Sequence, residues 1–374
     1  MMSAPIDTAK RVNLALQGGG AHGAFTWGVL DKLLEDGRID IEGICGTSAG
    51  ALNATVLAYG HTCGGNDGAR EALHSFWRAV SDTGMLASSV VPLRWPMLPF
   101  VGWHIHDALR FNWIETMTRL VSPYQFNPLN VNPLRQILEQ CVDFESLRNG
   151  NIKLFVSTTN VRTGQLRVFH THELTLDAVM ASACLPFVFQ AVAIDREYYW
   201  DGGYMGNPPL FPLFYHTDSR DVIVVHINPI VRDKLPTDAA DIMNRINEIS
   251  FNSSLLREFR AVTFVNKLIE EGWLKDEYKG RLKQIFVHSI RADQALTDVS
   301  VASKFSLEWS FLTALRDRGR VTAAAWLEQH FASVNRQSTV DLRAEFLDRH
   351  TLFWENSHSA QPERQHVERP SDNC

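Results

Sequence analysis

The apolar positions of the first sixty residues follow two different spacings, which predict strands alternating with helices. Residues 12–16 form a short apolar run that ends at a glycine run, which is typical of a strand buried on both faces. Residues 21–35 then carry apolar side chains at helical spacing, and the pattern stops before Gly37. A second short strand is predicted over 41–45 and is followed at once by GTSAG and an apolar stretch. Strand, helix, strand and helix within about fifty residues predict parallel strands joined by right-handed crossovers.

The same two spacings continue along the rest of the chain, without an internal repeat. Further strands are expected at 152–159, 165–170, 198–200, 221–227 and 284–289, and helices at 69–80, 133–141 and 175–185, with 61–68 as a glycine-rich loop. Residues 238–275 and 299–352 are expected to be mostly helical. We therefore predict an α/β domain over 1–230, a mostly helical part over 231–355 packed on it, and a polar, disordered tail over 356–374.

An insertion over about 81–130 breaks the regular pattern. Its segment from 88 to 113 is rich in proline and tryptophan and has no clean period. We interpret it as an irregular insertion packed on the main domain; the alternative is a lid or an apolar entry surface for a lipid-like substrate. The uncharged run over 178–194 contains Pro186 and is shorter than the ~20 apolar residues of a membrane-spanning helix. It is interpreted as a buried helix, a break and a buried strand.

Composition and charge narrow the class of protein. The chain of 374 residues is 45% hydrophobic and 21% charged, as in an ordinary globular protein. A formal net charge of −6 argues against nucleic acid as a partner. The five cysteines are scattered without a CxxC pair, which excludes a disulfide framework and a zinc site and fits a reducing compartment. The first residues lack the layout of a signal peptide, so we expect a cytoplasmic protein.

The segment Gly46-Thr47-Ser48-Ala49-Gly50 supplies a candidate nucleophile. It matches G-x-S-x-G between a predicted strand and a predicted helix, the context of a nucleophile elbow. A nucleophilic serine needs a base. Asp201 is a candidate because it directly follows a predicted strand and precedes two glycines. None of the 14 histidines lies in a recognisable site sequence, and His226, inside a predicted buried strand, is expected to be a satisfied core residue.

The glycine run QGGGAHGAF allows two interpretations. Gly18, Gly20 and Gly23 fit G-x-G-x-x-G, a pattern typical of dinucleotide binding when an acidic residue for the ribose follows about 20 residues later. Glu42 has roughly that spacing but lies inside the second strand. The same glycines can instead present backbone N–H groups to the oxyanion of an acyl-transfer reaction.

Four blocks in this order, QGGGAHGAF, GTSAG, ASACLP (residues 181–186) and DGG (residues 201–203), resemble the patatin-like phospholipase family. The resemblance covers about residues 10–230. It implies a three-layer α/β/α fold with a mainly parallel central sheet and, here, a helical C-terminal extension. It also implies a Ser–Asp dyad without a catalytic histidine, in which Ser48 is the nucleophile and Asp201 the base. The amides of Gly18, Gly19 and Gly20 would form the oxyanion hole, with no cofactor and no metal.

One residue departs from the family's glycine-rich block, which usually has arginine or lysine where this chain has His22. Loss of that permanent cation is expected to weaken anion stabilisation or to alter the head-group preference, while the backbone donors remain.

The resemblance implies a serine lipid acyl hydrolase that cleaves phospholipid or other acyl esters through an acyl-enzyme. Peripheral contact with a membrane or lipid granule is expected with such a substrate. The alternatives are a polyhydroxyalkanoate depolymerase or a short-chain esterase with the same dyad, a non-catalytic lipid-binding scaffold and, remotely, a dinucleotide-binding protein that holds NAD(P) or FAD.

Overall fold

A computed structural model describes residues 9–90, 121–232, 235–237, 239–278, 281–293, 295–296, 303–304 and 306–347. Its strands are β1 Lys10–Leu16, β2 Ile39–Gly46, β3 Lys153–Asn160, β4 Leu166–His170, β5 Val192–Ile194, β6 Glu197–Asp201, β7 Asp221–His226 and β8 Phe286–Arg291. Its α-helices are α1 Gly23–Asp36, α2 Ala49–Val90, α4 Pro123–Phe126, α5 Pro133–Cys141, α6 Phe144–Arg148, α7 Leu176–Ser182, α8 Phe211–His216, α9 Ala239–Glu270 and α10 Trp309–His330. Two 3₁₀ turns, η1 Gly20–His22 and η4 Gly202–Tyr204, matter for the site below.

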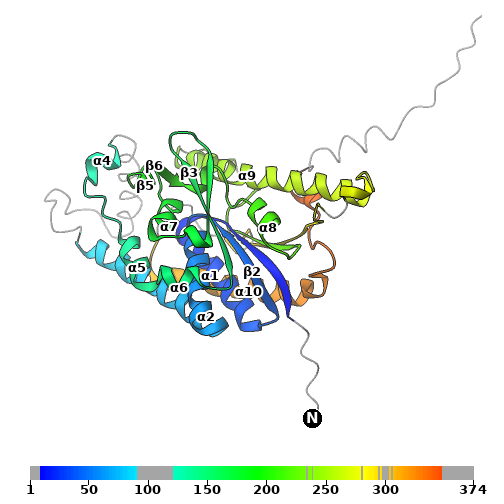
Figure 1. The fold of residues 1–374 in the computed structure, drawn as a ribbon. Coiled ribbons are helices and arrows are strands. Elements are labelled where there is room, and N and C mark those ends of the chain that lie inside the picture. The colour runs from blue at the N-terminus through cyan, green and yellow to red at the C-terminus, as the bar shows by residue number, and fades with distance from the viewer. Residues whose placement is uncertain are drawn as a thin grey trace, which may run out of the picture.

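The strands of this part of the chain form one sheet in the order β5-β6-β3-β2-β1-β7-β8, with β4 paired to β3 (Figure 1). The four pairings that involve β1, β2, β7 and β8 are parallel, and those of β4, β5 and β6 are antiparallel. The predicted α/β class with a mainly parallel sheet is therefore confirmed. In parallel strands all carboxyl ends lie at one edge of the sheet, which is where ligand sites of such folds form.

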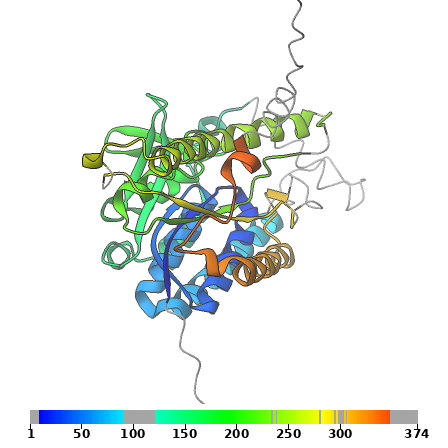
Figure 2. The same ribbon diagram turned by 90° about the vertical axis from the view of Figure 1, so that its right-hand side faces the viewer.

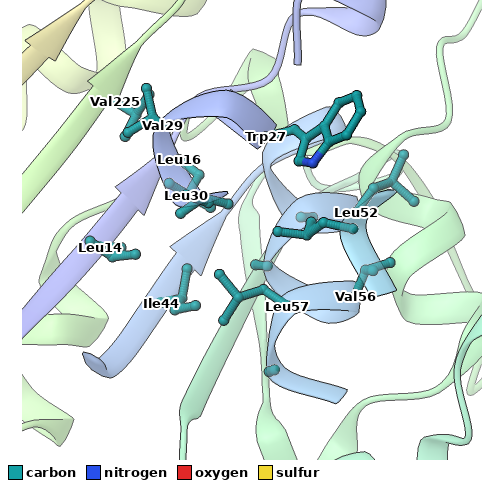
Figure 3. Close-up of a cluster of buried hydrophobic side chains, with 14 of the residues drawn as sticks. Leu14, Leu16, Trp27, Val29, Leu30, Ile44, Leu52, Val56, Leu57 and Val225 are labelled. Carbon is teal, nitrogen blue, oxygen red and sulfur yellow. The ribbon is translucent and has the colours of Figure 1, made fainter. Parts of the chain in front are cut away.

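Helices cover both faces of the sheet, as Figures 1 and 2 show. One buried cluster joins alternate strand residues to α1, α2, α7 and α10, and a second joins the intervening residues to α8 and α9. In Figure 3, Leu14, Leu16 and Ile44 of β1 and β2 pack against side chains of α1 and α2. Because both faces are buried, β1 shows little alternation between apolar and polar residues, the feature from which it was predicted.

The C-terminal third contributes to this same body. Strand β8 extends the sheet by pairing with β7, and α10 packs closely on α1. The close approach needs glycine on both helices: a Cβ at Gly28 would overlap the Arg316 carbonyl, and one at Gly319 would overlap the Phe25 carbonyl. Helix α10 thus fixes the position of α1, the helix that follows the glycine run.

Three sequence expectations differ from the structure. Residues 61–68 are not a loop throughout: the two helical segments of α2 meet at a kink, and only Gly64 and Gly65 leave helical geometry. The predicted buried strand within 178–194 is β5, which pairs with β6 alone and is partly exposed. Within 299–352, the described α-helix is α10, at 309–330.

Of the predicted insertion over 81–130, residues 91–120 lie outside the described part of the chain. The predicted tail over 356–374 lies wholly outside it as well. Among the helices that the structure describes, none is both long and apolar enough to cross a membrane.

Candidate active site

Ser48 lies on the tight turn that joins β2 to α2. Its φ of 53° is in the left-handed region, which a non-glycine residue adopts only where the surrounding structure enforces it. The flanking glycines make the turn possible: a Cβ at Gly46 would lie 2.7 Å from the Gly50 carbonyl oxygen, and one at Gly50 would overlap the Leu16 carbonyl. The strained strand-to-helix turn predicted from G-x-S-x-G is therefore present.

Hydrogen bonds from distant segments hold this turn. The Ser48 amide donates to Oγ of Ser182, the last residue of α7, at 2.9 Å. Thr47 Oγ1 donates to the Gly206 carbonyl at 2.7 Å and lies 2.5 Å from Ser157 Oγ on β3. These bonds tie the turn to α7, to β3 and to the segment that follows η4.

Asp201 is the last residue of β6 and is fully buried. Its amide donates to the Cys184 carbonyl at 2.8 Å, and Thr159 Oγ1 donates to its carbonyl at 2.9 Å, so its backbone is fixed from two sides. Its Oδ1 accepts from the Gly203 amide at 2.7 Å. Its Oδ2 is buried and has no partner at regular hydrogen-bond geometry within the described part of the chain.

The Ser48 side chain acts on the same carboxyl. Burial raises the pKa of Asp201 to about 7, while hydrogen bonding from the Gly203 amide and from the Ser48 side chain lowers it. The Ser48 side chain thus influences the carboxyl, although Asp201 Oδ2 has no partner at regular hydrogen-bond geometry among the described residues. The structure thus brings together the two residues that the sequence singled out, on turns 153 positions apart (201 − 48).

The glycine run lies directly against this pair. A Cβ at Gly18 would be 2.6 Å from Ser48 Cβ, so only glycine lets the run approach the serine. The Gly18 amide already donates to Asn207 Oδ1 at 2.6 Å. The amides of Gly19 and Gly20 have no acceptor among the described residues, so two of the three predicted donors are available.

Gln17, the residue before the glycines, organises the surrounding loops. Its Oε1 accepts from the amides of Ile227 and Asn228, both at 3.0 Å, at the end of β7. Its Nε2 donates to the Asn207 carbonyl at 3.3 Å and to Asn252 Oδ1 of α9 at 3.1 Å. One buried amide therefore fixes the glycine run relative to β7, α9 and the residue that holds Gly18.

Comparison with known proteins shows the family of the chain. The model of a family described as "Patatin-like phospholipase" matches residues 14–214, which is more than half of the 374-residue chain and includes both Ser48 and Asp201. The chain belongs to the patatin-like phospholipase family.

The chain also has more distant likenesses to individual proteins. The cGAMP-activated phospholipase of Escherichia coli (strain TW11681) is 25% identical over 262 residues, 61% of this chain and 64% of the relative, so the match spans less than two thirds of that protein. The crystal structure of VipD from Legionella pneumophila aligns with 94% of this chain over 74% of its own, at 13% identity and a TM-score of 0.41. The ExoU–SpcU complex of Pseudomonas aeruginosa aligns with 88% of this chain and 77% of its own, at 18% identity and a TM-score of 0.30.

His22 stands where patatin-like phospholipases usually have a cation, and it is buried in η1. Its Nε2 lies 2.8 Å from Ser303 Oγ. Burial, followed by the positive charges of Lys304 and Arg232, lowers the pKa of His22 to about 3. His22 is therefore neutral at physiological pH and supplies no charge to the glycine run.

Two other sequence candidates have structural roles in this patatin-like chain. The Glu42 carboxylate accepts from the amides of Asp218 and Ser219 at 2.7 and 2.8 Å and from Lys153 at 2.9 Å, so it is not free for a ribose. His226 is buried as expected, but both its ring nitrogens lack partners in the described structure, so the expectation that they are satisfied is wrong. Its ring stacks on Phe346, and an aromatic ring offers no regular hydrogen bond.

No histidine forms a hydrogen bond or ion pair with Ser48 or Asp201 within the described ranges, which omit His104, His106, His350, His358 and His366. Across the same ranges, no group of three or more His, Cys, Asp or Glu side chains could hold a metal ion.

Sequence reasoning missed Gln17, Ser182, Asn207 and Asn228. Gln17 and Ser182 lie inside the blocks that resemble the family, so the resemblance could have indicated that they belong to the site. The two asparagines follow strands without any distinguishing pattern, and only their hydrogen bonds to the glycine run reveal their role.

A mainly apolar cavity of about 760 Å³ has Trp200, the residue before Asp201, in its lining, whereas Ser48 and Asp201 themselves do not line it. Two of its lining residues, Trp200 and Tyr204, flank Asp201 in sequence, and a third, Thr159, donates to the Asp201 carbonyl. The lining is Val121, Ser122, Pro123, Tyr124, Gln125, Thr159, Pro186, Phe187, Trp200 and Tyr204. Its size is within the range of pockets that hold small organic ligands.

Proposed function

We propose that this chain is a serine lipid acyl hydrolase that cleaves carboxylic esters with a Ser48–Asp201 dyad through an acyl-enzyme. The observation that carries the proposal is a strained serine whose side chain acts on a fully buried carboxyl with a pKa of about 7. A base whose pKa is near the working pH is well matched to proton transfer. Membership of the patatin-like phospholipase family supports the same chemistry.

In the first half-reaction Asp201 accepts the hydroxyl proton of Ser48 while the serine oxygen attacks the ester carbonyl. The amides of Gly19 and Gly20 donate to the oxyanion that forms, whereas Gly18 serves as the contact that lets the run approach Ser48. Losing one oxyanion donor typically costs about 3 kcal/mol of barrier. The tetrahedral species then collapses, and the departing alcohol takes the proton from Asp201 and leaves an acyl-enzyme.

In the second half-reaction a water molecule gives its proton to Asp201 and attacks the acyl carbonyl. The same two amides stabilise the second oxyanion. The Ser48 oxygen leaves with the proton held by Asp201, and the fatty acid is released. No group other than the dyad, the amides and water is needed to balance either step.

The apolar cavity lined by Trp200 and Tyr204 supports an ester with an apolar acyl chain over a small polar ester. An acyl chain in this space would bury apolar surface against Trp200 and Tyr204 at roughly 25 cal/mol per Å². We therefore propose a phospholipid or comparable lipid ester as substrate. Such a substrate would be bound at a membrane or lipid-granule surface, and we propose that the protein is cytoplasmic. A polyester depolymerase or short-chain esterase with the same dyad is an alternative outcome of the test below.

The test is a substrate panel of p-nitrophenyl esters of graded chain length, phospholipid vesicles and polyhydroxyalkanoate granules. Each reaction is run with and without cGAMP, because the Escherichia coli relative is named for activation by it. Ser48→Ala and Asp201→Asn should abolish turnover, and a fluorophosphonate should label Ser48 in the wild type. Ser75→Ala, an exposed serine of α2, is the matched control and should leave turnover unchanged.

Hydrolysis of long-chain lipid esters in preference to short ones would support the lipid substrate. Full activity in Ser48→Ala, or no hydrolysis of any ester by the wild type in either condition, would refute the proposal.

A further inference from the structure

Lys304 reaches the glycine run from the C-terminal part of the chain. Its carbonyl oxygen lies 2.6 Å from the point where a Cβ of Gly20 would be, so its backbone packs directly on the run. The next residue back, Ser303, bonds His22 at the other end of η1. Residues 303 and 304 therefore cover the loop that carries the two free amides.

The ammonium group of Lys304 points back to the same loop. Its Nζ donates to Asn228 Oδ1 at 3.3 Å. That amide in turn donates through Nδ2 to the Gly18 carbonyl at 2.7 Å, and its Oδ1 lies 3.7 Å from the Cβ position of Gly19. A single side chain thus separates the Lys304 charge from the backbone that carries the oxyanion donors.

No carboxylate neutralises this charge in a direct ion pair within the described residues. The acidic group that acts on it, Glu248 of α9, is already bonded to Arg232 at 2.6 Å and to Arg245 at 3.2 Å. Burial lowers the pKa of Lys304, Glu248 raises it, and Arg232 lowers it. His22, the remaining titratable group of the loop, is neutral. Glu248 is thus shared by three cations, Lys304, Arg232 and Arg245, while Asp241 and Asp293 also act on Arg232.

We propose that Lys304 is a positioning residue that supplies, from the C-terminal part of the chain, the positive charge next to the oxyanion loop that His22 does not supply. A fixed charge in a partly desolvated site acts on the oxyanion more strongly than it would in water. It acts through the Asn228–Gly18 contact and through the field at Gly19 and Gly20. This inference rests on the proposed acyl hydrolase function.

Two substitutions separate the charge of Lys304 from its hydrogen bond. Lys304→Gln removes the charge and keeps a donor toward Asn228, whereas Lys304→Met removes both. If the charge matters, both variants should lose about tenfold or more in kcat on the preferred ester with KM within about twofold, because the interaction forms only in the transition state. Their Tm should not fall, since removing a desolvated charge is seldom destabilising.

Ser303→Ala is the matched control for a purely structural role, in which residues 303 and 304 only hold η1 in place. It removes a hydrogen bond between the same segment and η1 without changing charge, and it should keep kcat within about threefold of wild type, an effect of under one hydrogen bond.

Wild-type kcat in Lys304→Gln would overturn the inference, as would an equal loss in Ser303→Ala or a drop in Tm that parallels the loss of activity. Each of these leaves the proposed function intact, because the wild type turns over. Absence of wild-type turnover would instead refute the proposed function and this inference with it.

Discussion

Replacing Asp201 by asparagine should make the protein more stable at alkaline pH while it abolishes activity. The carboxyl is fully buried, and burial raises its pKa from 3.8 to about 7 in the folded chain. Between these two values the folded state holds a proton that the unfolded state has released. Raising the pH from 3.8 to about 7 therefore destabilises the folded wild type. Above pH 7 the full free-energy cost of the buried charge remains. Asparagine does not titrate.

The magnitude follows from the pKa difference of about three units. At 1.36 kcal/mol per unit, ionisation of Asp201 costs the folded state at most about 4 kcal/mol, of which about 3 kcal/mol is incurred between pH 5 and pH 8. The side chain introduced by Asp201→Asn would keep an oxygen for the Gly203 amide, and any change in its other hydrogen bond is independent of pH. The difference in stability between variant and wild type should therefore grow by about 3 kcal/mol from pH 5 to pH 8.

The same titration governs activity, since only the ionised carboxylate can accept the Ser48 proton. With a pKa near 7, the ionised fraction rises about tenfold between pH 6 and pH 8, so kcat/KM should rise by the same factor and then level off.

Urea unfolding at pH 5 and pH 8 measures the stability difference, and fatty acid released from a fixed substrate measures kcat/KM at constant ionic strength. Asp195→Asn, at an exposed position in the β5–β6 turn, is the matched control and should change neither result. A stability difference that is the same at both pH values would refute the account of Asp201. So would a kcat/KM that is flat from pH 5.5 to 8.5, or one with its midpoint near 4.

Three further predictions test the contacts around the dyad. Gly18→Ala places a Cβ 2.6 Å from Ser48 Cβ and should displace the serine, so that fluorophosphonate labels Ser48 about a hundredfold more slowly. Labelling at the wild-type rate would contradict this close contact. Ser182→Ala removes the acceptor of the Ser48 amide and should lower kcat/KM about tenfold, an effect of about one hydrogen bond; unchanged steady-state kinetics would show that the bond is dispensable. His22→Gln should leave the pH profile unchanged between pH 5.5 and 8.5, because a pKa of about 3 keeps His22 neutral there; a shifted acid limb would show that it titrates.

Much of the fold, and the choice of Ser48 and Asp201 as candidate residues, follow from local features of the sequence. The apolar run before the glycines, the helical spacing after them and the G-x-S-x-G turn predict β1, α1 and the Ser48 turn, because dihedral preferences and the period of side chains act over a few residues. Asp201 was found in the same way, from a strand end followed by glycines. The kink in α2 was misjudged because glycines at 64 and 65 indicate a break without giving its length.

Only the tertiary structure decides how these pieces act together. Gly18 and Asn207 are 189 residues apart, and their bond, which engages one predicted oxyanion donor, depends on how two distant loops pack. The pKa of about 7 at Asp201 and that of about 3 at His22 are consequences of burial, which no local pattern encodes. Lys304 likewise has no motif; its charge lies beside the glycine run because the chain returns there after β8. Residue types and spacing therefore determine which groups can react, whereas packing determines their protonation, their partners and the field in which they work.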